Sequence, residues 1–408
     1  MARDSFDIVV VGAGPAGAVA AYAATRRGLS VALVDRRTFP RDKACGDGIG
    51  PGAVQVLRRL GLGSVFERHP AVTELTVFAP DGGRLDSVIP PIDGRPMCGH
   101  IITRYDFDNY LVRAAVSAGA ADLTGVRYLG MTREPELRRV ELRGSDGTTF
   151  DVDARLVIGA DGAYSAVRRT LTGDKARRSR HQSIALRAYA SSDNFLPGGR
   201  IGQRLVLDYS SDLLPGYGWL FPLDDGRVNV GVGMLVDELK RRDDDLKSVL
   251  AAFVERARAR GIDLGELHDQ RAHHLPHVGG MPRLTYPRAA LLGDAASMIN
   301  PVSGEGIAYA VTAAADFIDA LPGDVGDSGR LNAALTRFER DFRRRYRAHF
   351  LSCRLYLEMM RHQRPATSIL RALQHDPRVL HAGVNLLFGF GSIHPRTVLR
   401  ILTSSRRG

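Results

Sequence analysis

The chain of 408 residues contains few cysteines, few lysines and no long apolar run. Its three cysteines, Cys45, Cys98 and Cys353, are odd in number and widely separated, so the sequence predicts no disulfide framework and favours a reducing, cytoplasmic setting. No stretch approaches the roughly 20 apolar residues that a membrane-spanning helix needs, and we expect no signal peptide. These shortages argue against a disulfide-stabilised secreted scaffold and against an integral membrane protein.

Lysine occurs at only four positions, so nearly all of the 56 basic residues are arginine, and the net charge is +11. Such an excess suits anionic ligands or an anionic membrane surface. The sequence has no nucleic-acid-binding motif and no ligand spacing typical of a metal site, so we expect neither nucleic acid nor metal as a partner. The length suffices for two domains, or for one large domain with an insertion.

The most informative segment lies at the beginning of the chain. An apolar strand, residues 6–11, precedes a glycine-rich turn and an alanine-rich helix that continues to Ala24. The turn reads Gly12-Ala13-Gly14-Pro15-Ala16-Gly17. In a dinucleotide-binding unit the first glycine makes the turn, the second admits a pyrophosphate, and the third allows close packing of the helix. The free N–H groups at the start of the helix then hold the phosphates.

The next strand supports the same interpretation. It covers residues 31–34 and ends at Asp35, whose carboxylate can accept hydrogen bonds from ribose hydroxyls. Arg36 follows as a further candidate contact to the cofactor. Strand, turn, helix, strand and acid in this order predict that the chain binds an adenine dinucleotide.

Two later strands also end in turns that contain glycine and aspartate. Asp161 follows the strand at 156–159, and Gly293 and Asp294 follow the strand that begins at residue 289. Both acids are therefore expected at the carboxyl edge of an α/β sheet, where ligands bind. The carboxylate of Asp294 is suited to ribityl hydroxyls. These two segments narrow the predicted dinucleotide to FAD.

A further helix is expected to begin close to the flavin. Its first N–H groups, which can support the pyrimidine end of an isoalloxazine, belong to the segment with Gly304, Gly306 and Ile307. Another helix begins at Arg104. The glycine-rich turn at Gly12, the turn with Asp161 and the turn with Asp294 follow one another along the chain. In these three motifs and their order the chain resembles the glutathione-reductase-type flavoproteins of the p-hydroxybenzoate hydroxylase class. The resemblance implies a discontinuous FAD-binding Rossmann-like fold of the α/β class, with Arg104 in contact with the phosphate-ribitol portion of FAD.

Within that class the chain resembles the geranylgeranyl reductase family in a loop after the second strand. The loop reads Phe39-Pro40-Arg41-Asp42-Lys43-Ala44-Cys45-Gly46-Asp47-Gly48 and is most similar to actinobacterial reductases that act on a menaquinone side chain. The resemblance places the loop beside the isoalloxazine, which makes Cys45, Gly46, Asp47 and Gly48 candidate cofactor contacts. The Cys45 thiol is the candidate catalytic group, as proton donor or gate, although a small cysteine also serves simple packing. The sequence gives no reason to prefer one of Asp47, His273 and His274 over the others as a further polar group of the site.

A second segment with the same family resemblance is Pro215-Gly216-Tyr217-Gly218-Trp219-Leu220-Phe221-Pro222, which is similar to a substrate-cavity motif. On a strand, alternation places Tyr217, Trp219 and Phe221 on one face. They can form an apolar wall for a long isoprenoid, and the competing interpretation is an ordinary aromatic core.

We expect an α/β FAD-binding part with an inserted antiparallel-sheet substrate domain and a C-terminal helical region. The FAD-binding part comprises residues 1–71, 100–179 and 283–325; the substrate part comprises 72–99 and 180–282; the helical region comprises 326–408. In that last region Phe338, Phe342, Tyr346 and Phe350 repeat every four residues along one helix face, which is typical of core packing. The interleaved arginines suit a solvated face or peripheral contact with the cytoplasmic side of a membrane.

The leading hypothesis is an FAD-dependent reductase that saturates carbon–carbon double bonds of a polyprenyl chain, such as a menaquinone side chain or a geranylgeranyl group. The main alternative is an FAD monooxygenase that hydroxylates or epoxidises an aromatic or terpenoid compound. A halogenase is disfavoured because no lysine occurs between residues 43 and 175, and a prenyl-binding chaperone is disfavoured by the intact flavin signatures. The electron donor is NAD(P)H or a small redox protein, between which the sequence does not choose.

Overall fold

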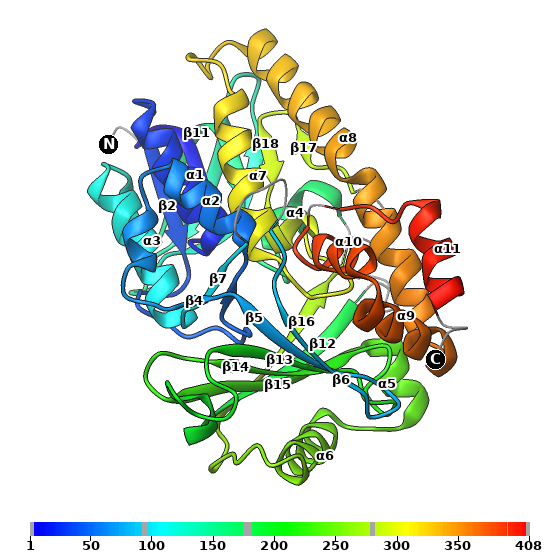
Figure 1. The fold of residues 1–408 in the computed structure, drawn as a ribbon. Helices are drawn as coiled ribbons and strands as arrows, with labels where there is room; N and C mark the ends of the chain where they lie inside the picture. The colour runs from blue at the N-terminus through cyan, green and yellow to red at the C-terminus, as the bar shows by residue number, and fades with distance from the viewer. Residues whose placement is uncertain (1–3, 92–96, 174–181, 278–281, 390, 405–408) are drawn as a thin grey trace.

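The computed structural model describes residues 4–91, 97–173, 182–277, 282–389 and 391–404. These residues form three sheets together with α-helices that cover them (Figure 1). The expected mixed α/β architecture is confirmed at this level.

The first sheet has parallel strands at its centre. Its order is β17 (Thr285–Tyr286), β18 (Ala289–Leu291), β11 (Thr149–Gly159), β1 (Ser5–Val11), β2 (Val31–Asp35) and β8 (Ala121–Thr124), with the hairpin strands β9 (Arg127–Arg133) and β10 (Arg138–Arg143) attached to β11. Ile8, Val9 and Val10 are fully buried, as expected for a parallel strand that is covered on both faces. The carboxyl ends of β1, β2, β11 and β18 meet at one edge, which brings the expected glycine and aspartate turns together.

Helices pack closely on this sheet because the contact residues are small. Helix α1 (Pro15–Arg26) packs against α3 (Arg104–Ser117) and α7 (Ile307–Ala320), and α2 (Pro51–Arg59) also packs on α7. A Cβ on Gly17 would lie 1.8 Å from the carbonyl oxygen of Gly12, and one on Gly12 would lie 2.3 Å from the carbonyl oxygen of Ala160. Any larger residue would push α1 away from the strands. The short helix α4 (Ala166–Thr172) follows β11.

A second sheet has seven strands, drawn from two separate parts of the chain. Its order is β16 (His268–Pro276), β12 (Gln182–Ser191), β15 (Arg227–Leu235), β14 (Tyr217–Pro222), β13 (Arg204–Asp208), β5 (Glu74–Phe78) and β6 (Arg84–Val88). The expectation of an antiparallel sheet is wrong at one pair, because β13 runs parallel to β5. Parallel neighbours need a long crossover, and the chain between residues 89 and 203, which includes β11 of the first sheet, provides it.

Further elements surround the two sheets. Strands β3 (Gly48–Ile49), β7 (Gly99–Ile101) and β4 (Ala71–Val72) form a small antiparallel sheet. Figure 1 shows α6 (Leu246–Ala259) on the far face of the seven-stranded sheet, while α5 (Val236–Arg242) lies at its end. Among the described residues, the one-turn helices are η1 (Gly63–Phe66), η3 (Asp193–Phe195) and η4 (Gly293–Ala296).

The C-terminal part is helical, as the sequence predicts. It consists of α8 (Ser328–Met360), α9 (Gln363–His375), α10 (Pro377–Leu387) and α11 (Pro395–Ser404). Helix α8 packs on α7 and β17 beside the first sheet and continues to α9, α10 and α11, which pack on one another (Figure 1). The aromatic side chains Phe338, Phe342, Tyr346 and Phe350 are all buried, so the interpretation of this stripe as core is confirmed. Along the described parts of the chain, no helix combines the length and apolar character needed to span a bilayer.

Candidate active site

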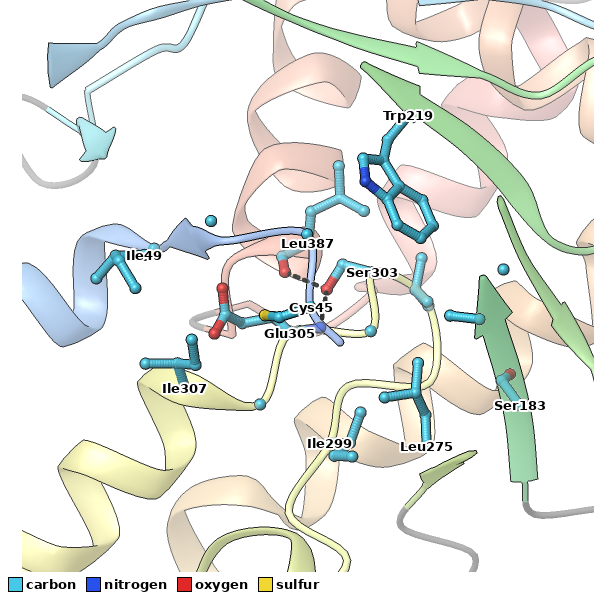
Figure 2. Close-up of a pocket in the computed structure, with 18 of the residues that line it drawn as sticks. Cys45, Ile49, Ser183, Trp219, Leu275, Ile299, Ser303, Glu305, Ile307 and Leu387 are labelled. Atoms are coloured by element: carbon cyan, nitrogen blue, oxygen red, sulfur yellow. Dashed lines mark hydrogen bonds between the residues drawn. The ribbon is translucent and has the colours of Figure 1, made fainter. Parts of the chain in front are cut away.

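A large pocket connects the glycine-rich turn of the first sheet with the seven-stranded sheet and the C-terminal helices. Its cavity volume is about 270 Å³. Figure 2 shows its central part, with Trp219 on one side and Glu305 and Ile307 on the other. Of the candidates from the sequence, the following line the pocket: Gly14, Pro15, Ala16, Cys45, Gly46, Gly48, Arg104, Tyr217, Trp219, Phe221, Gly293, Asp294, Gly304, Gly306 and Ile307.

The end of the pocket at the glycine-rich turn carries positive charge. Helix α1 begins there after Gly14, and a Cβ on Gly14 would be 3.9 Å from terminal guanidinium nitrogens of both Arg41 and Arg104. Asp108 holds both arginines: its carboxylate oxygens lie 2.6 and 2.7 Å from Arg104 and 2.7 Å from Arg41. Two guanidinium groups, one carboxylate and the N-terminus of a helix fit a bound diphosphate.

The other members of the glycine turn do not line the pocket but support it. Gly12 and Gly17 provide the close contact of α1 with the sheet. Asp35, at the end of β2, accepts hydrogen bonds from the backbone N–H groups of Ala13 (2.8 Å) and Arg37 (2.9 Å). Its carboxylate thus lies at the turn, whereas Arg36 is exposed. Their contact with a cofactor remains a prediction.

The two later aspartates have different environments. The Asp161 carboxylate accepts hydrogen bonds from the N–H groups of Ala166 (2.6 Å) and Val167 (3.1 Å), so it caps α4, while Ala160 and Gly162 on either side of it line the pocket. Direct contact of Asp161 with a cofactor remains a prediction.

Asp294, in η4, lines the pocket and lies 3.4 Å from Lys43 Nζ. Burial acts to raise the pKa of Asp294, but the charge and hydrogen bond of Lys43, together with the charge of Arg104 and the effect of His273, outweigh it and keep the pKa below its usual value. The nearby His273 also lines the pocket, and burial and Lys43 lower its pKa to about 4, which leaves its imidazole neutral. A carboxylate that stays ionised can accept hydrogen bonds from hydroxyl groups, as Asp294 is predicted to do.

Cys45 lines the centre of the pocket. Burial raises the pKa of its thiol, and the nearby Arg104 guanidinium only partly offsets this effect. The thiol is therefore neutral and protonated at physiological pH. A Cβ on the next residue, Gly46, would lie 3.3 Å from the ring of Phe221 and 3.5 Å from Trp219 Nε1, so the loop packs directly on the aromatic strand.

A buried polar network holds this loop against the seven-stranded sheet. Asn229 on β15 donates hydrogen bonds to the carbonyl oxygen of Cys45 (2.9 Å) and to the Asp47 carboxylate (2.8 Å), and it accepts one from Trp219 Nε1 (2.8 Å). Tyr189 on β12 donates to the same carboxylate at 2.6 Å. Burial raises the pKa of Asp47 to about 6. Asp47 therefore lies behind the pocket wall and fixes the loop.

The aromatic strand β14 forms the opposite wall. Tyr217, Trp219 and Phe221 share one face, as alternation predicts, with ring centroids 5.9 and 6.3 Å apart along the row. A Cβ on Gly231 of the neighbouring strand would lie 2.1 Å from the indole, so the glycine makes room for the ring. Beyond this wall the pocket is lined by aliphatic and aromatic side chains from distant elements: Leu75, Ile89, Leu205, Leu207, Tyr209, Leu235, Leu275, Val302, Leu357, Leu387 and Phe388.

Several site residues were not among the candidates from the sequence. Lys43 lies in the loop that resembles the family, but the sequence does not predict that it pairs with Asp294. Asn229 and Tyr189 become neighbours of the loop only through strand pairing, for which no local signal exists. Glu305 lies inside the segment whose amides are expected at the flavin, and a glutamate between two glycines is a signal that could have identified it.

Glu305 contributes a carboxyl group to the pocket. One of its oxygens accepts a hydrogen bond from the N–H of Ala308 at 2.9 Å, in the first turn of α7. Burial raises the pKa of Glu305 to about 6. Tyr217, on the opposite wall, donates a hydrogen bond to the carbonyl oxygen of Ser303, and the Ser303 hydroxyl donates to the carbonyl oxygen of Leu387 at 2.8 Å (Figure 2). The residues before α7 thus connect β14 with α10.

Comparison with known proteins agrees with this geometry. Residues 5–325 match the family model described as FAD binding domain. The chain is 35% identical over 319 residues to menaquinone reductase of Mycobacterium tuberculosis (strain ATCC 25618 / H37Rv), which covers 78% of this chain and 77% of the relative. It is 29% identical to digeranylgeranylglycerophospholipid reductase 1 of Methanopyrus kandleri, with 83% and 87% coverage.

A solved structure shares the fold. The geranylgeranyl bacteriochlorophyll reductase-like protein of Thermoplasma acidophilum superposes with a TM-score of 0.80 at 22% identity, over 100% of this chain and 98% of the other. The sequence-based expectation of FAD as cofactor is confirmed by the family match. The chain belongs to the geranylgeranyl reductase family of FAD-binding oxidoreductases.

Proposed function

We propose that this protein saturates one or more carbon–carbon double bonds of an isoprenoid chain, with a menaquinone side chain or a geranylgeranyl lipid as the substrate class. The observation that carries the proposal is the continuity of the pocket. A charged end, suited to the FAD diphosphate, opens without interruption into an apolar cavity bounded by β14 and by Leu357, Leu387 and Phe388. The reductase relatives support the same substrate class.

The site residues fit FAD along the length of the pocket. Gly14 is open toward the cavity, with the guanidinium groups of Arg41 and Arg104 beside it, which suits the diphosphate. Ionised Asp294 suits the ribityl hydroxyls. The amides at Gly306 and Ile307, at the start of α7, suit the pyrimidine end of the isoalloxazine. When bound and reduced, FAD supplies the hydride for the saturation of an alkene.

The chain itself contributes position and exclusion of water. An unactivated alkene has no carbonyl group on which charge could be stabilised, so the walls must hold the double bond in place and keep it dry. Trp219 and Phe221 form such a wall, and the neutral thiol of Cys45 adds no charge to it. Each buried methylene contributes about 0.8 kcal/mol to binding, so an isoprenoid tail supplies ample affinity. In this proposal Cys45 closes the pocket around the reacting bond.

The proposed assignment of regions follows the same division. Residues 1–71, 100–179 and 283–325 bind FAD, residues 72–99 and 180–282 supply the apolar wall, and residues 326–408 contribute Leu357, Leu387 and Phe388 to the apolar lining. The electron donor is NAD(P)H or a small redox protein.

The proposal includes peripheral contact with a membrane, from which a lipid substrate enters. Leu351 and Leu355 on α8 are exposed by 65% and 51%, and the exposed Arg347 and Arg354 lie on the same helix. Leucines flanked by arginines suit an anionic bilayer. Sedimentation with vesicles of anionic phospholipid tests this contact, and the double variant Leu351→Ser/Leu355→Ser should bind them more weakly. Equal sedimentation of both proteins would contradict it.

The decisive experiment uses anaerobic holoenzyme reduced with dithionite. It is incubated separately with menaquinone, geranylgeranyl diphosphate and geranylgeranylated phospholipid, and the products are measured by mass spectrometry. We expect a mass increase of two hydrogens for each bond reduced. Unchanged substrates throughout would refute the proposal. Aerobic consumption of one O₂ for each hydroxylated or epoxidised product would identify the monooxygenase alternative instead.

A further inference from the structure

Saturation of an alkene consumes a proton as well as a hydride, and five acidic side chains line the pocket: Cys45, Tyr209, Tyr217, Asp294 and Glu305. Asp294, whose pKa is lowered, stays ionised and has no proton to give, and burial raises the pKa of Tyr209 far above its usual value. Burial raises the pKa of both Cys45 and Tyr217, which leaves them neutral and weak as acids. Efficient general acids have a pKa near the working pH. Glu305, with its pKa raised to about 6, is the group in this set that meets the condition.

The surroundings of Glu305 suit a carboxyl that is alternately protonated and ionised. In Figure 2 its carboxyl lies between Ile49 and Ile307, with Trp219 across the pocket. The same carboxyl approaches the backbone at Gly50, where an added Cβ would lie 2.8 Å from Oε2, and Phe388 is close to that point. These apolar neighbours favour the neutral acid.

The start of α7 stabilises the ionised form of the same carboxyl. Oε1 accepts the N–H of Ala308, and the backbone of Ile307 adds to this stabilisation. The titratable groups close to Glu305 are the phenols of Tyr217, from β14, and Tyr309, from α7, and the thiol of Cys45, which Figure 2 shows beside its side chain. Across the described segments no arginine or lysine is paired with Glu305. Burial therefore raises the pKa of Glu305, and the N–H groups at the start of α7 limit this rise.

We propose that Glu305 is the general acid of the reduction. The step balances as follows: the π bond of the alkene breaks, one carbon receives the hydride from reduced FAD, and the other receives the proton of Glu305 as its O–H bond breaks. The resulting carboxylate is held by the amides of α7 and regains its proton from solvent after product release. This inference rests on the reductase function proposed above and adds the source of the proton.

The test compares Glu305→Gln with wild type and with Glu358→Gln, an exposed glutamate on α8. Glutamine keeps an acceptor for the Ala308 N–H but has no acidic proton. We expect Glu305→Gln to retain FAD and to slow single-turnover reduction by about 10²-fold or more. Wild type and Glu358→Gln should lose rate as pH rises above about 6, and Cys45→Ala should keep that dependence. A rate for Glu305→Gln within about twofold of wild type, or loss of the pH dependence in Cys45→Ala instead, would overturn the proposal.

A second measurement does not depend on turnover. Infrared difference spectra of oxidised holoenzyme, recorded between about pH 5 and pH 8, should contain a protonated carboxyl band that disappears on titration and is missing in Glu305→Gln. The band should persist in Asp47→Asn, which separates it from the other carboxyl with a pKa of about 6. Identical spectra for wild type and Glu305→Gln would refute the acid role.

If wild type saturates no isoprenoid, the proposed function fails, whereas these spectra still report on Glu305. Should Glu305→Gln not load FAD, Glu305→Asp takes its place, with slower reduction and a retained pH dependence expected.

Discussion

Individual residues in this protein combine structural and chemical roles, and the carboxyl groups illustrate this best. Asp108 neutralises one of two arginines, Asp161 caps a helix, Asp294 stays ionised beside Lys43, and Glu305 has a pKa of about 6. The same functional group thus acquires different acid strengths, because burial and neighbouring charges differ at each place. The sequence predicts that several acids are important but not which form each adopts.

Asp47 provides a test of this principle through stability. Its pKa is about 6 in the folded protein, against an ordinary value of 3.8 for an aspartate in water, so the folded state holds the proton more tightly. The stability contribution of Asp47 is therefore present below about pH 4 and is lost as pH rises to about 6. Two pKa units correspond to about 3 kcal/mol.

We expect the free energy of unfolding of Asp47→Asn, relative to wild type, to rise by up to about 3 kcal/mol between pH 4 and pH 7. Guanidinium denaturation of the holoenzyme at several pH values measures this difference. Asp319→Asn, at an exposed carboxylate, should show no such trend. A difference for Asp47→Asn that does not vary with pH would contradict the assignment.

At the scale of elements, the protein shows which parts of a site are encoded locally. Residues 6–35 form a strand, a turn, a helix and a strand as predicted, because the glycine spacing and the small side chains act between neighbours in the chain. In contrast, Asn229 reaches Cys45 across 184 positions, and the β13–β5 pair is parallel against expectation. Such contacts depend on how distant strands pair, and no local pattern in either segment specifies the partner.

The contact between α1 and β1 can be tested with one methyl group. Gly17→Ala would place a Cβ 1.8 Å from the carbonyl oxygen of Gly12, so α1 and the amides at its start, which are predicted to bind phosphate, must move. We expect a destabilisation of about 1–3 kcal/mol and loss of FAD during gel filtration. Gly130→Ala on β9 is the matched control, since its Cβ would meet nothing within 4 Å. Retention of FAD at full occupancy by Gly17→Ala would show that the turn tolerates more space than the structure allows.

At the scale of the whole molecule, the pocket joins regions that are far apart in the sequence. Its charged end belongs to the first sheet, its middle to β14, the Cys45 loop and the end of α10, and α8 adds Leu357 to the apolar lining. In the proposed function, a longer isoprenoid fills more of this apolar lining. We expect chain-length selectivity to be set there, at side chains such as Leu357.

Leu357 on α8 allows this to be measured. Leu357→Trp narrows the apolar part of the cavity, so we expect the KM for a long polyprenyl substrate to rise by about tenfold or more while that for a short one changes little, since about two lost methylene contacts suffice. Ala333→Trp changes an exposed residue near the other end of the same helix and should affect neither substrate. Equal changes for short and long chains would contradict this position for the tail.

The parallel pairing of β13 with β5 has a consequence for how the protein comes to be made. Strands of the two sheets alternate along the chain: the second sheet lacks an edge until β16 ends at residue 276, and the first lacks β18 until residue 291. The second sheet is completed only after most strands of the first, and the first only after the whole of the second. A nascent chain that has not yet reached β16 must hold both cores open, and contacts of such long range close slowly.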